Sequence, residues 1–264
     1  MILNIAGRWW RGLMISSAAL AWSGGLWPSA ASADIVTILP RIKPSVVAVG
    51  TYQRTRTPPF QFLGTGFVVG NGLFIATNAH VVPASLADDQ MESLVIALPG
   101  EQQSMVRKVT KAAVDKNSDL AVLRLTGDPM PSLQLADADL ANEGQTIAFT
   151  GFPIGSALGL SPVTHRGIIS AITPIGIPQA RSRELNPALI RRLSGDAFRV
   201  YQLDATAYPG NSGSPLFDPE TGRVLGIVNM VFVKNTKENV LSDPSGITYA
   251  IPVAHLKALL KDIQ

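Results

Sequence analysis

Residues 208–215 read Tyr-Pro-Gly-Asn-Ser-Gly-Ser-Pro and set Ser212 between glycines at 210 and 213. Glycine beside a serine permits a tight turn and lets another molecule approach the backbone closely. Pro209 and Pro215 restrict the backbone on the two sides of the turn. One serine between glycines is also typical of an ordinary turn, so the meaning of this stretch depends on the rest of the chain.

Two polar segments upstream indicate that Ser212 is part of a catalytic site. They are Thr77-Asn78-Ala79-His80 and Asn117-Ser118-Asp119-Leu120, so the chain order is His, Asp, Ser. A serine hydroxyl is a poor nucleophile unless a base lies within hydrogen-bond reach and a third group orients that base. We predict Ser212 as the nucleophile, His80 as the base and Asp119 as the orienting group. This order is that of the chymotrypsin-type triad, and it differs from the subtilisin and α/β-hydrolase orders.

The glycine before Ser212 predicts a site for a developing oxyanion. The backbone N–H groups of Gly210 and Ser212 can point into one small cavity if the turn is tight enough, and such donors stabilise the negative charge of an acyl-transfer transition state. Asn211, between them, is a neutral amide and a weak partner for an ammonium group. Digestive trypsin-like enzymes place an aspartate at this position, where it pairs with a newly cut N-terminal ammonium. The resemblance to that type of triad therefore implies no activation by N-terminal cleavage beyond the removal of an export signal.

Short apolar runs, separated by Gly, Pro, Asn or Asp, recur at close spacing along the chain. This rhythm favours an all-β fold of antiparallel barrels over a parallel α/β sheet. About six runs precede and about six follow the Pro- and Ala-rich stretch 128–144, which predicts two barrels. Residues 254–263 carry leucines and isoleucine at helical spacing and predict a C-terminal helix. A second helix is expected at 186–195, within a basic insertion at 174–199.

The N-terminus is typical of an export signal. Arg8 and Arg11 precede an apolar stretch, and Ala31-Ser32-Ala33 predicts cleavage before Asp34. Cleavage there removes two basic residues and no acid, so the formal net charge falls from +3 to +1 (3 − 2). That balance, with no basic run interleaved with aromatics, argues against a nucleic-acid partner. The chain has no cysteine and three scattered histidines, so we expect no metal and no cofactor.

Several motifs together resemble the protease domain of the HtrA (Deg) family of trypsin-like serine proteases. The motifs lie at 64–69 (GTGFVV), 77–82 (TNAHVV), 119–123 (DLAVL), 210–215 (GNSGSP), 226–228 (GIV) and 249–252 (YAIP). The resemblance covers roughly residues 40–260. It implies a chymotrypsin/trypsin-like double β-barrel, with His80, Asp119 and Ser212 as the catalytic triad and Gly210, Asn211 and Ser212 as the oxyanion loop.

The domain organisation that follows is a signal peptide at 1–33 and a protease domain at 34–264. Its N-terminal barrel spans about 40–127 and its C-terminal barrel about 145–253, and no PDZ domain is expected. Family members often form trimers through N-terminal aromatic contacts, but residues 34–45 hold no aromatic residue. Both a monomer and a homotrimer therefore stay open.

The resemblance implies a periplasmic or secreted serine endopeptidase, without a stable membrane anchor, that hydrolyses peptide bonds in unfolded or damaged proteins. Two alternatives stay open: a binding or scaffolding module whose site opens only with a partner, and a processing protease with one client. Residues expected beside the bound peptide are Ala207, Tyr208, Val228, Asn229 and Met230. No acidic residue lies among 205–211, which favours small to medium apolar side chains before the cleaved bond.

Overall fold

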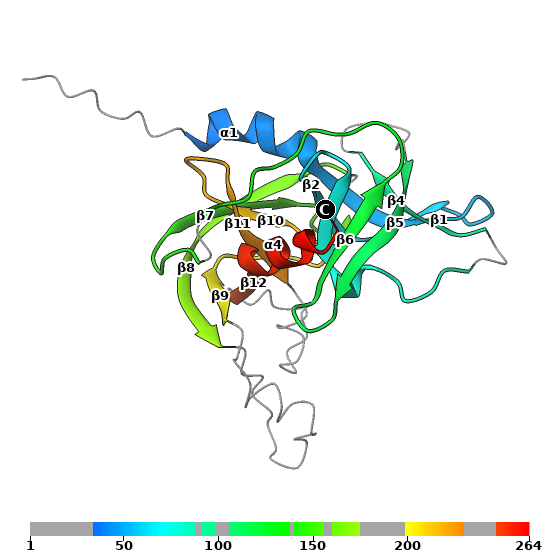
Figure 1. Ribbon diagram of the computed structural model, residues 1–264. Coiled ribbons are helices and arrows are strands. Elements are labelled where there is room, and N and C mark those ends of the chain that lie inside the picture. Colours follow the sequence, from blue (N-terminus) through cyan, green and yellow to red (C-terminus); the bar gives the residue numbers. More distant parts are fainter. Residues whose placement is uncertain are drawn as a thin grey trace, which may run out of the picture. The chain divides into compact units, whose positions relative to one another are not determined.

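The structure is a computed structural model that describes residues 34–87, 91–98, 106–137, 140–155, 160–174, 199–229 and 247–263. These residues form twelve strands, two α-helices and two short 3₁₀ helices (Figure 1). The helices are α1 (Ile35–Ile42), η1 (Lys43–Ser45), η2 (Ala79–Val81) and α4 (Val253–Lys261). The strands are β1 (Val46–Tyr52), β2 (Phe60–Val69), β3 (Phe74–Asn78), β4 (Ser93–Ala97), β5 (Val106–Asp115), β6 (Leu120–Leu125), β7 (Thr146–Gly151), β8 (Val163–Pro174), β9 (Arg199–Asp204), β10 (Pro215–Phe217), β11 (Val224–Asn229) and β12 (Ile247–Pro252).

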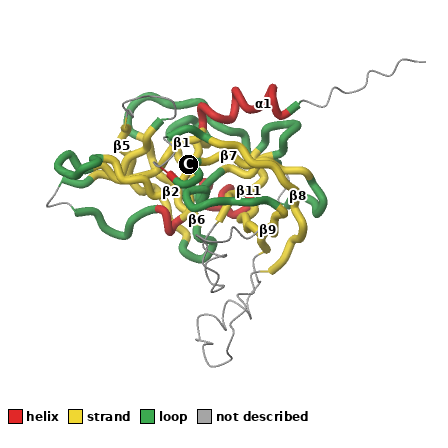
Figure 2. The backbone as a smooth tube through the Cα atoms, turned by 180° about the vertical axis from the view of Figure 1, so that it is seen from behind, coloured by secondary structure: helices red, strands yellow, loops and turns green. Residues whose placement is uncertain are grey.

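The strands close into two antiparallel barrels, one from each half of the chain. The strand order is β1-β2-β3-β6-β5-β4 in the first barrel and β10-β11-β12-β9-β8-β7 in the second. Closure leaves neither barrel with an open edge strand. Figures 1 and 2 show the two groups of strands side by side, with the chain passing from one to the other between β6 and β7. The predicted all-β double barrel is therefore confirmed.

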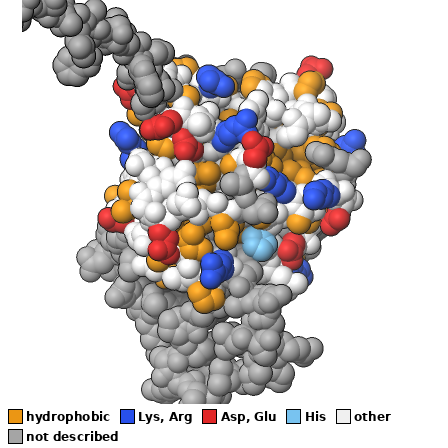
Figure 3. All heavy atoms as spheres, turned by 60° about the vertical axis from the view of Figure 1, so that its left-hand side comes forward, with side chains coloured by type: hydrophobic (Ala, Val, Ile, Leu, Met, Phe, Trp, Pro, Cys, Tyr) orange, Lys and Arg blue, Asp and Glu red, His pale blue; other side chains and the backbone are white. Residues whose placement is uncertain are grey.

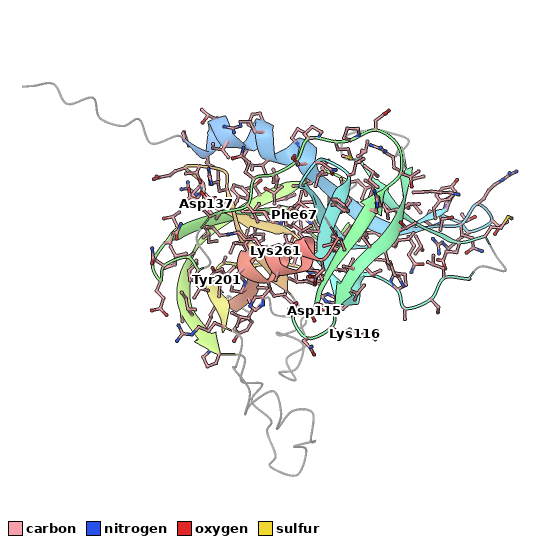
Figure 4. The ribbon with its side chains drawn as sticks, viewed as in Figure 1. Phe67, Asp115, Lys116, Asp137, Tyr201 and Lys261 are labelled. Atoms are coloured by element: carbon pink, nitrogen blue, oxygen red, sulfur yellow. The ribbon has the colours of Figure 1, made fainter. Side chains whose placement is uncertain are left out.

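A continuous apolar core joins the barrels. Phe67 of β2 and Leu120 of β6 belong to the same buried cluster as Phe149 of β7 and Phe217 of β10, and each of these four side chains is inaccessible to solvent. Figure 4 labels Phe67 in the middle of the molecule, between the strands of the two barrels. A second cluster, which includes Ile75 and Leu123, fills the interior of the first barrel alone. The shared core fixes the orientation of one barrel against the other.

The C-terminal helix α4 lies over both barrels. Its buried side chains are Val253, Leu256 and Leu260, and Leu259 and Ile263 are partly buried against the core, so the predicted C-terminal helix is confirmed. The helix contacts β5 and β6 of the first barrel and β11 and β12 of the second. In Figure 1 it runs across the front of the molecule between the two sets of strands.

Helix α1 is an element that the sequence patterns did not predict. Asp34 caps it, because its side chain accepts a hydrogen bond from the Val36 amide. Ile38 and Ile42, one helical turn apart, are 4% and 2% exposed. The interior Pro40 and the length of eight residues weaken the helical signal in the sequence. Burial of the two isoleucines therefore stabilises this helix.

Several predicted elements fall outside the described residues: the signal peptide at 1–33, the helix at 186–195 and Met230. In the part of the chain that is described, no helix is long and apolar enough to cross a membrane. Figure 3 shows acidic and basic side chains interspersed with apolar ones on the visible face.

Candidate active site

His80 and Asp119 meet because two paired strands end at the same place. Asn78, the last residue of β3, is the register partner of Leu120, the first residue of β6. His80 follows β3 in the short helix η2, and Asp119 immediately precedes β6. Oδ2 of Asp119 lies 2.6 Å from Nδ1 of His80, and Oδ1 accepts a 2.9 Å hydrogen bond from the His80 amide. A carboxylate on Nδ1 holds the proton there and leaves Nε2 as an acceptor.

The backbone around Asp119 fixes the direction of its carboxylate. Asp119 has φ +54°, a left-handed conformation that aspartate tolerates better than most residues. Its carbonyl accepts hydrogen bonds from the Ala79 amide and from Nδ2 of Asn78. The turn before it is held by Asp115, which accepts from the Asn117 amide and the Ser118 hydroxyl. The turn is therefore braced from both sides.

Asp115 itself is partly buried beside helix α4. Burial raises the pKa of its carboxyl group, but the hydrogen bonds from Ser118 and from backbone amides outweigh burial and lower that pKa. Figure 4 labels Asp115 and its neighbour Lys116 in the turn below α4. An ionised Asp115 carboxylate continues to accept the hydrogen bonds from the Asn117 amide and the Ser118 hydroxyl, and these hydrogen bonds keep the turn ordered near neutral pH.

Asn229 brings a donor from the second barrel to the same carboxylate. It is the last residue of β11 and fully buried, and its Nδ2 donates a 2.7 Å hydrogen bond to Oδ2 of Asp119. The sequence predicted Asn229 beside a bound peptide and did not predict this contact. The only available signal was an amide ending the apolar run 224–228. Peptide contact by Asn229 stays a prediction.

Ser212 stands on a loop between β9 and β10 that is clamped by both barrels. The carbonyl of Ser212 accepts a 2.9 Å hydrogen bond from the amide of Thr65 on β2, and Gly213 donates a 3.0 Å hydrogen bond to the carbonyl of Val228 on β11. A side chain at Gly213, where φ is +88°, would overlap the Thr65 carbonyl and would lie 2.5 Å from the hydroxyl of Thr77. The serine therefore lies against the strand that leads to His80.

The loop also leaves two backbone donors unused. Gly210 has φ +103°, and a side chain there would overlap the Phe152 carbonyl. The Asn211 amide donates to the Tyr208 carbonyl and the Ser214 amide to the Asn211 carbonyl. Within the described residues, the amides of Gly210 and Ser212 donate no hydrogen bond. An oxyanion site requires backbone N–H donors that are not already used within the fold.

The proposed nucleophile and base are not hydrogen-bonded in the described structure. Among the contacts of the described residues, none joins the Ser212 hydroxyl to the His80 ring. His80 keeps 30% of its side chain exposed, whereas Ser212 is 6% exposed. Such hydrogen bonds are often long in enzymes without substrate and tighten when substrate binds.

The other residues predicted beside a peptide lie close to this loop. Ala207 is 5% exposed and Val228 is fully buried, while Tyr208 is half-buried. The ring centroid of Tyr208 lies 5.9 Å from that of His165 in β8, and His165 stacks on Phe149 at 4.9 Å. Burial lowers the pKa of His165, so its ring is neutral near pH 7. An uncharged ring therefore lies beside Tyr208.

Comparison with known proteins shows which family this chain resembles. The trypsin-like peptidase domain matches residues 64–227, which is more than half of the chain. A probable periplasmic serine endoprotease, DegP-like, of Halomonas elongata is 32% identical over 192 residues, covering 72% of this chain and 33% of the relative. DegP-like proteins of Pseudomonas putida and Hahella chejuensis are 26% and 29% identical over 194 and 202 residues, covering 73% and 76% of this chain and 33% and 35% of the relatives. The chain thus spans about a third of the length of these curated relatives.

A solved structure supports the fold. The Rv3671c protease from M. tuberculosis, in its active form, matches with a TM-score of 0.61 at 22% sequence identity, covering 86% of this chain and 83% of that one. The resemblance to HtrA-type proteases drawn from the motifs is confirmed by the DegP-like relatives. With the domain match across both barrels and the double-barrel topology, the chain belongs to the trypsin-like peptidase family.

Proposed function

We propose that the protein is a serine endopeptidase in which His80, Asp119 and Ser212 form the catalytic triad. Nε2 of His80 takes the hydroxyl proton as Ser212 Oγ attacks the peptide carbonyl carbon. The Gly210 and Ser212 amides stabilise the resulting oxyanion. Collapse of the tetrahedral intermediate breaks the C–N bond, and His80 returns the proton to the leaving amine. Water then attacks the acyl-enzyme by the same route and releases the acid.

The observation that carries this proposal is the 2.6 Å contact between Asp119 Oδ2 and His80 Nδ1. It fixes the tautomer that general-base catalysis through Nε2 requires. The Gly210 and Ser212 amides, which donate no hydrogen bond among the described residues, support the oxyanion step of the mechanism. A chance surface ion pair would not be expected to bring a buried amide, Asn229, to the same oxygen.

The proposed substrates are unfolded or damaged polypeptides outside the cytoplasm. The names of the DegP-like relatives, probable periplasmic serine endoproteases, support this place of action. We propose that residues 1–33 direct export and are removed, and that residues 34–264 form the protease domain with barrels at about 40–127 and 145–253. The mature chain would act as a monomer or a homotrimer.

For the cleaved sequence, we propose small to medium apolar side chains before the scissile bond. Ala207, Tyr208, Val228 and Met230 would form the walls against which that side chain packs, and Asn229 would adjoin the bound strand through its backbone. The neutral His165 behind Tyr208 supports an uncharged pocket.

The first test is labelling of the purified chain with a fluorophosphonate probe. We expect a covalent adduct on Ser212, located by mass spectrometry, that is lost in His80→Ala. Digestion of reduced, unfolded casein against a folded control protein then tests the substrate class. Labelling that persists unchanged in His80→Ala would contradict the triad. Equal digestion of folded and unfolded proteins would contradict the substrate class alone.

A second function is favoured by one observation, the missing hydrogen bond between Ser212 and His80 among the described residues. In a binding or scaffolding module, the site would be assembled only when a partner binds. Ser212→Ala separates the two functions, because an enzyme would lose its cellular role and a scaffold would keep it.

A further inference from the structure

Three buried polar atoms next to Ser212 have no hydrogen-bond partner among the residues that the structure describes. They are Oδ1 and Nδ2 of Asn211 and Oγ of Ser214. Asn211 and Ser214 are each fully inaccessible to solvent. Exchanging the oxygen and nitrogen of the Asn211 amide would not help, because neither atom has a partner. Buried polar groups in native proteins are nearly always paired with protein or with ordered water.

The three atoms lie close to one another around Gly151, at the end of β7. A side chain built on Gly151 would overlap Ser214 Oγ, would lie 2.8 Å from Asn211 Oδ1 and would lie 3.0 Å from Thr65 Oγ1. Thr65 Oγ1 already donates to the Gly210 carbonyl at 2.7 Å and accepts from the Phe152 amide at 3.1 Å. It can accept one more hydrogen bond. Polar atoms of Thr65, Asn211 and Ser214 therefore surround Gly151.

We propose that Asn211 and Ser214 form a closed site for one water molecule that positions the oxyanion loop. The site offers an amide donor, an amide acceptor and a hydroxyl that can do either. Water, with two donors and two acceptors, matches that mixture and typically makes about three hydrogen bonds in such places. In the described part of the chain no group of His, Asp and Glu could hold a metal ion, and neither residue carries a charge that would attract an ion.

The water acts on catalysis through Asn211, the residue between the two free amides of Gly210 and Ser212. Asn211 is tied to the turn by its backbone, through the Tyr208 carbonyl on one side and the Ser214 amide on the other. A water hydrogen-bonded to the Asn211 side chain adds a third interaction that holds this residue, from the buried side of the loop. Ser214 is then a positioning residue: its hydroxyl holds the water, and the water holds Asn211.

The structural test uses the full chain with Ser212→Ala, which needs no activity. A crystal structure at about 1.5 Å resolution is expected to show one water within about 3.2 Å of both Ser214 Oγ and the Asn211 amide, the usual hydrogen-bond range. A direct hydrogen bond from Ser214 to Asn211 without water would overturn the site. So would protein atoms filling the space between them.

The kinetic test rests on the proposed function and compares Ser214→Ala with Ser45→Ala. Ser45 is 1% exposed and its hydroxyl is also unpaired, so Ser45→Ala removes a similar group elsewhere in the fold. We expect Ser214→Ala to lower kcat about tenfold at unchanged KM, less than the ~10²–10³ cost of losing an oxyanion donor. Ser45→Ala should leave both constants unchanged. Equal kcat values in the two variants would overturn the positioning role.

The two tests fail independently. If no fluorophosphonate adduct forms on Ser212 in the unaltered chain, the proposed function fails, yet the water can still be seen in the crystal. If the adduct forms and no water is seen, the proposed function stands and the water site falls.

Discussion

Asn229 of the second barrel donates a 2.7 Å hydrogen bond from Nδ2 to Oδ2 of Asp119 in the first barrel. The same carboxylate oxygen lies 2.6 Å from Nδ1 of His80. One oxygen therefore receives a donor from each barrel. Since Asn229 is fully buried, water cannot easily replace its amide if the side chain is removed.

Asn229→Ala should lower kcat by about tenfold to a hundredfold. A hydrogen bond to a charged group is worth about 1.5–3 kcal/mol, and about 1.4 kcal/mol corresponds to a factor of ten in rate. The measurement is kcat on a peptide substrate, with Asn142→Ala as a control on a residue that lies outside the site. An unchanged kcat in Asn229→Ala would mean that Asp119 is oriented without it.

Asp119→Asn should lower kcat by about 10⁴, as in the well-studied case of this triad, because an amide can hold the histidine in the wrong tautomer. The two hydrogen bonds that the Asp119 carbonyl accepts, from the Ala79 amide and from Nδ2 of Asn78, do not involve the carboxylate, so the fold should persist. Unfolding by urea, followed by circular dichroism, checks that point. A variant with normal stability and near-normal kcat would remove Asp119 from the triad.

Gly151→Ala should disturb the Ser212 loop, because the added methyl group would overlap the Ser214 hydroxyl. We expect slower labelling of Ser212 by a fluorophosphonate and a lower melting temperature. Adding Ser214→Gly should recover part of both, since it removes the overlapping atom and leaves the milder contacts with Asn211 and Thr65. If the losses of labelling rate and melting temperature caused by Gly151→Ala and Ser214→Gly simply added in the double variant, residues 151 and 214 would not compete for the same space.

Acid should weaken the fold through His165. Burial lowers the pKa of this histidine in the folded chain, whereas its unfolded pKa is about 6.5. Below that value the unfolded chain binds the proton more readily, so the free energy of unfolding should fall as the pH falls from about 6.5 through the folded pKa. Urea titrations at pH 7.5 and pH 5 measure this loss. His255, whose pKa is also lowered by burial, changes stability in the same direction.

The contribution of His165 can be isolated with His165→Phe, which retains an aromatic ring against Phe149 and Tyr208. The variant should lose less stability between pH 7.5 and pH 5 than the unaltered chain. An identical loss in both proteins would assign the whole acid effect to other groups.

Helix α1 should contribute to the stability of the barrels. Ile38→Ala is expected to cost about 2–5 kcal/mol in the free energy of unfolding, the usual range for a buried isoleucine. Val36→Ala on the same helix is the control, because Val36 is 67% exposed and should change stability by less than about 0.5 kcal/mol. Similar values for both variants would mean that α1 does not pack on the fold in solution.

The fold was accessible from the sequence because barrel strands are short, apolar and regularly spaced. The run at 46–52 is β1, and the run at 120–125 is β6. Strand β10 did not stand out as a separate run because it has three residues directly after the Ser212 loop. Strand β5 extends past its apolar run to Asp115, since its second half is partly exposed and its residues alternate weakly. Backbone pairing with β6 defines that half, and pairing leaves little trace in residue type.

The candidate site was accessible in part. Order along the chain and flanking apolar runs identified His80 and Asp119, which the structure brings to 2.6 Å. The roles assigned to Ser212 and Gly210 stay predictions, although their backbone geometry is compatible with them. The contact of Asn229 with Asp119 could not be foreseen, because it depends on how the end of β11 in one barrel meets the start of β6 in the other. Such a contact is set by three-dimensional packing across 110 positions of sequence separation.

Because the proposed site is divided between two barrels, its chemistry depends on how the two barrels are aligned. His80 and Asp119 belong to one closed barrel, and Ser212 and Asn229 to the other. The apolar core that the barrels share holds them in one orientation, so a change in that core that rotates one barrel would separate the serine from the histidine. Under the proposed function, a core substitution of this kind would lower turnover while both barrels stayed folded. The turnover rate of this protein would then respond to the alignment of the barrels more sensitively than circular dichroism or another measure of secondary structure.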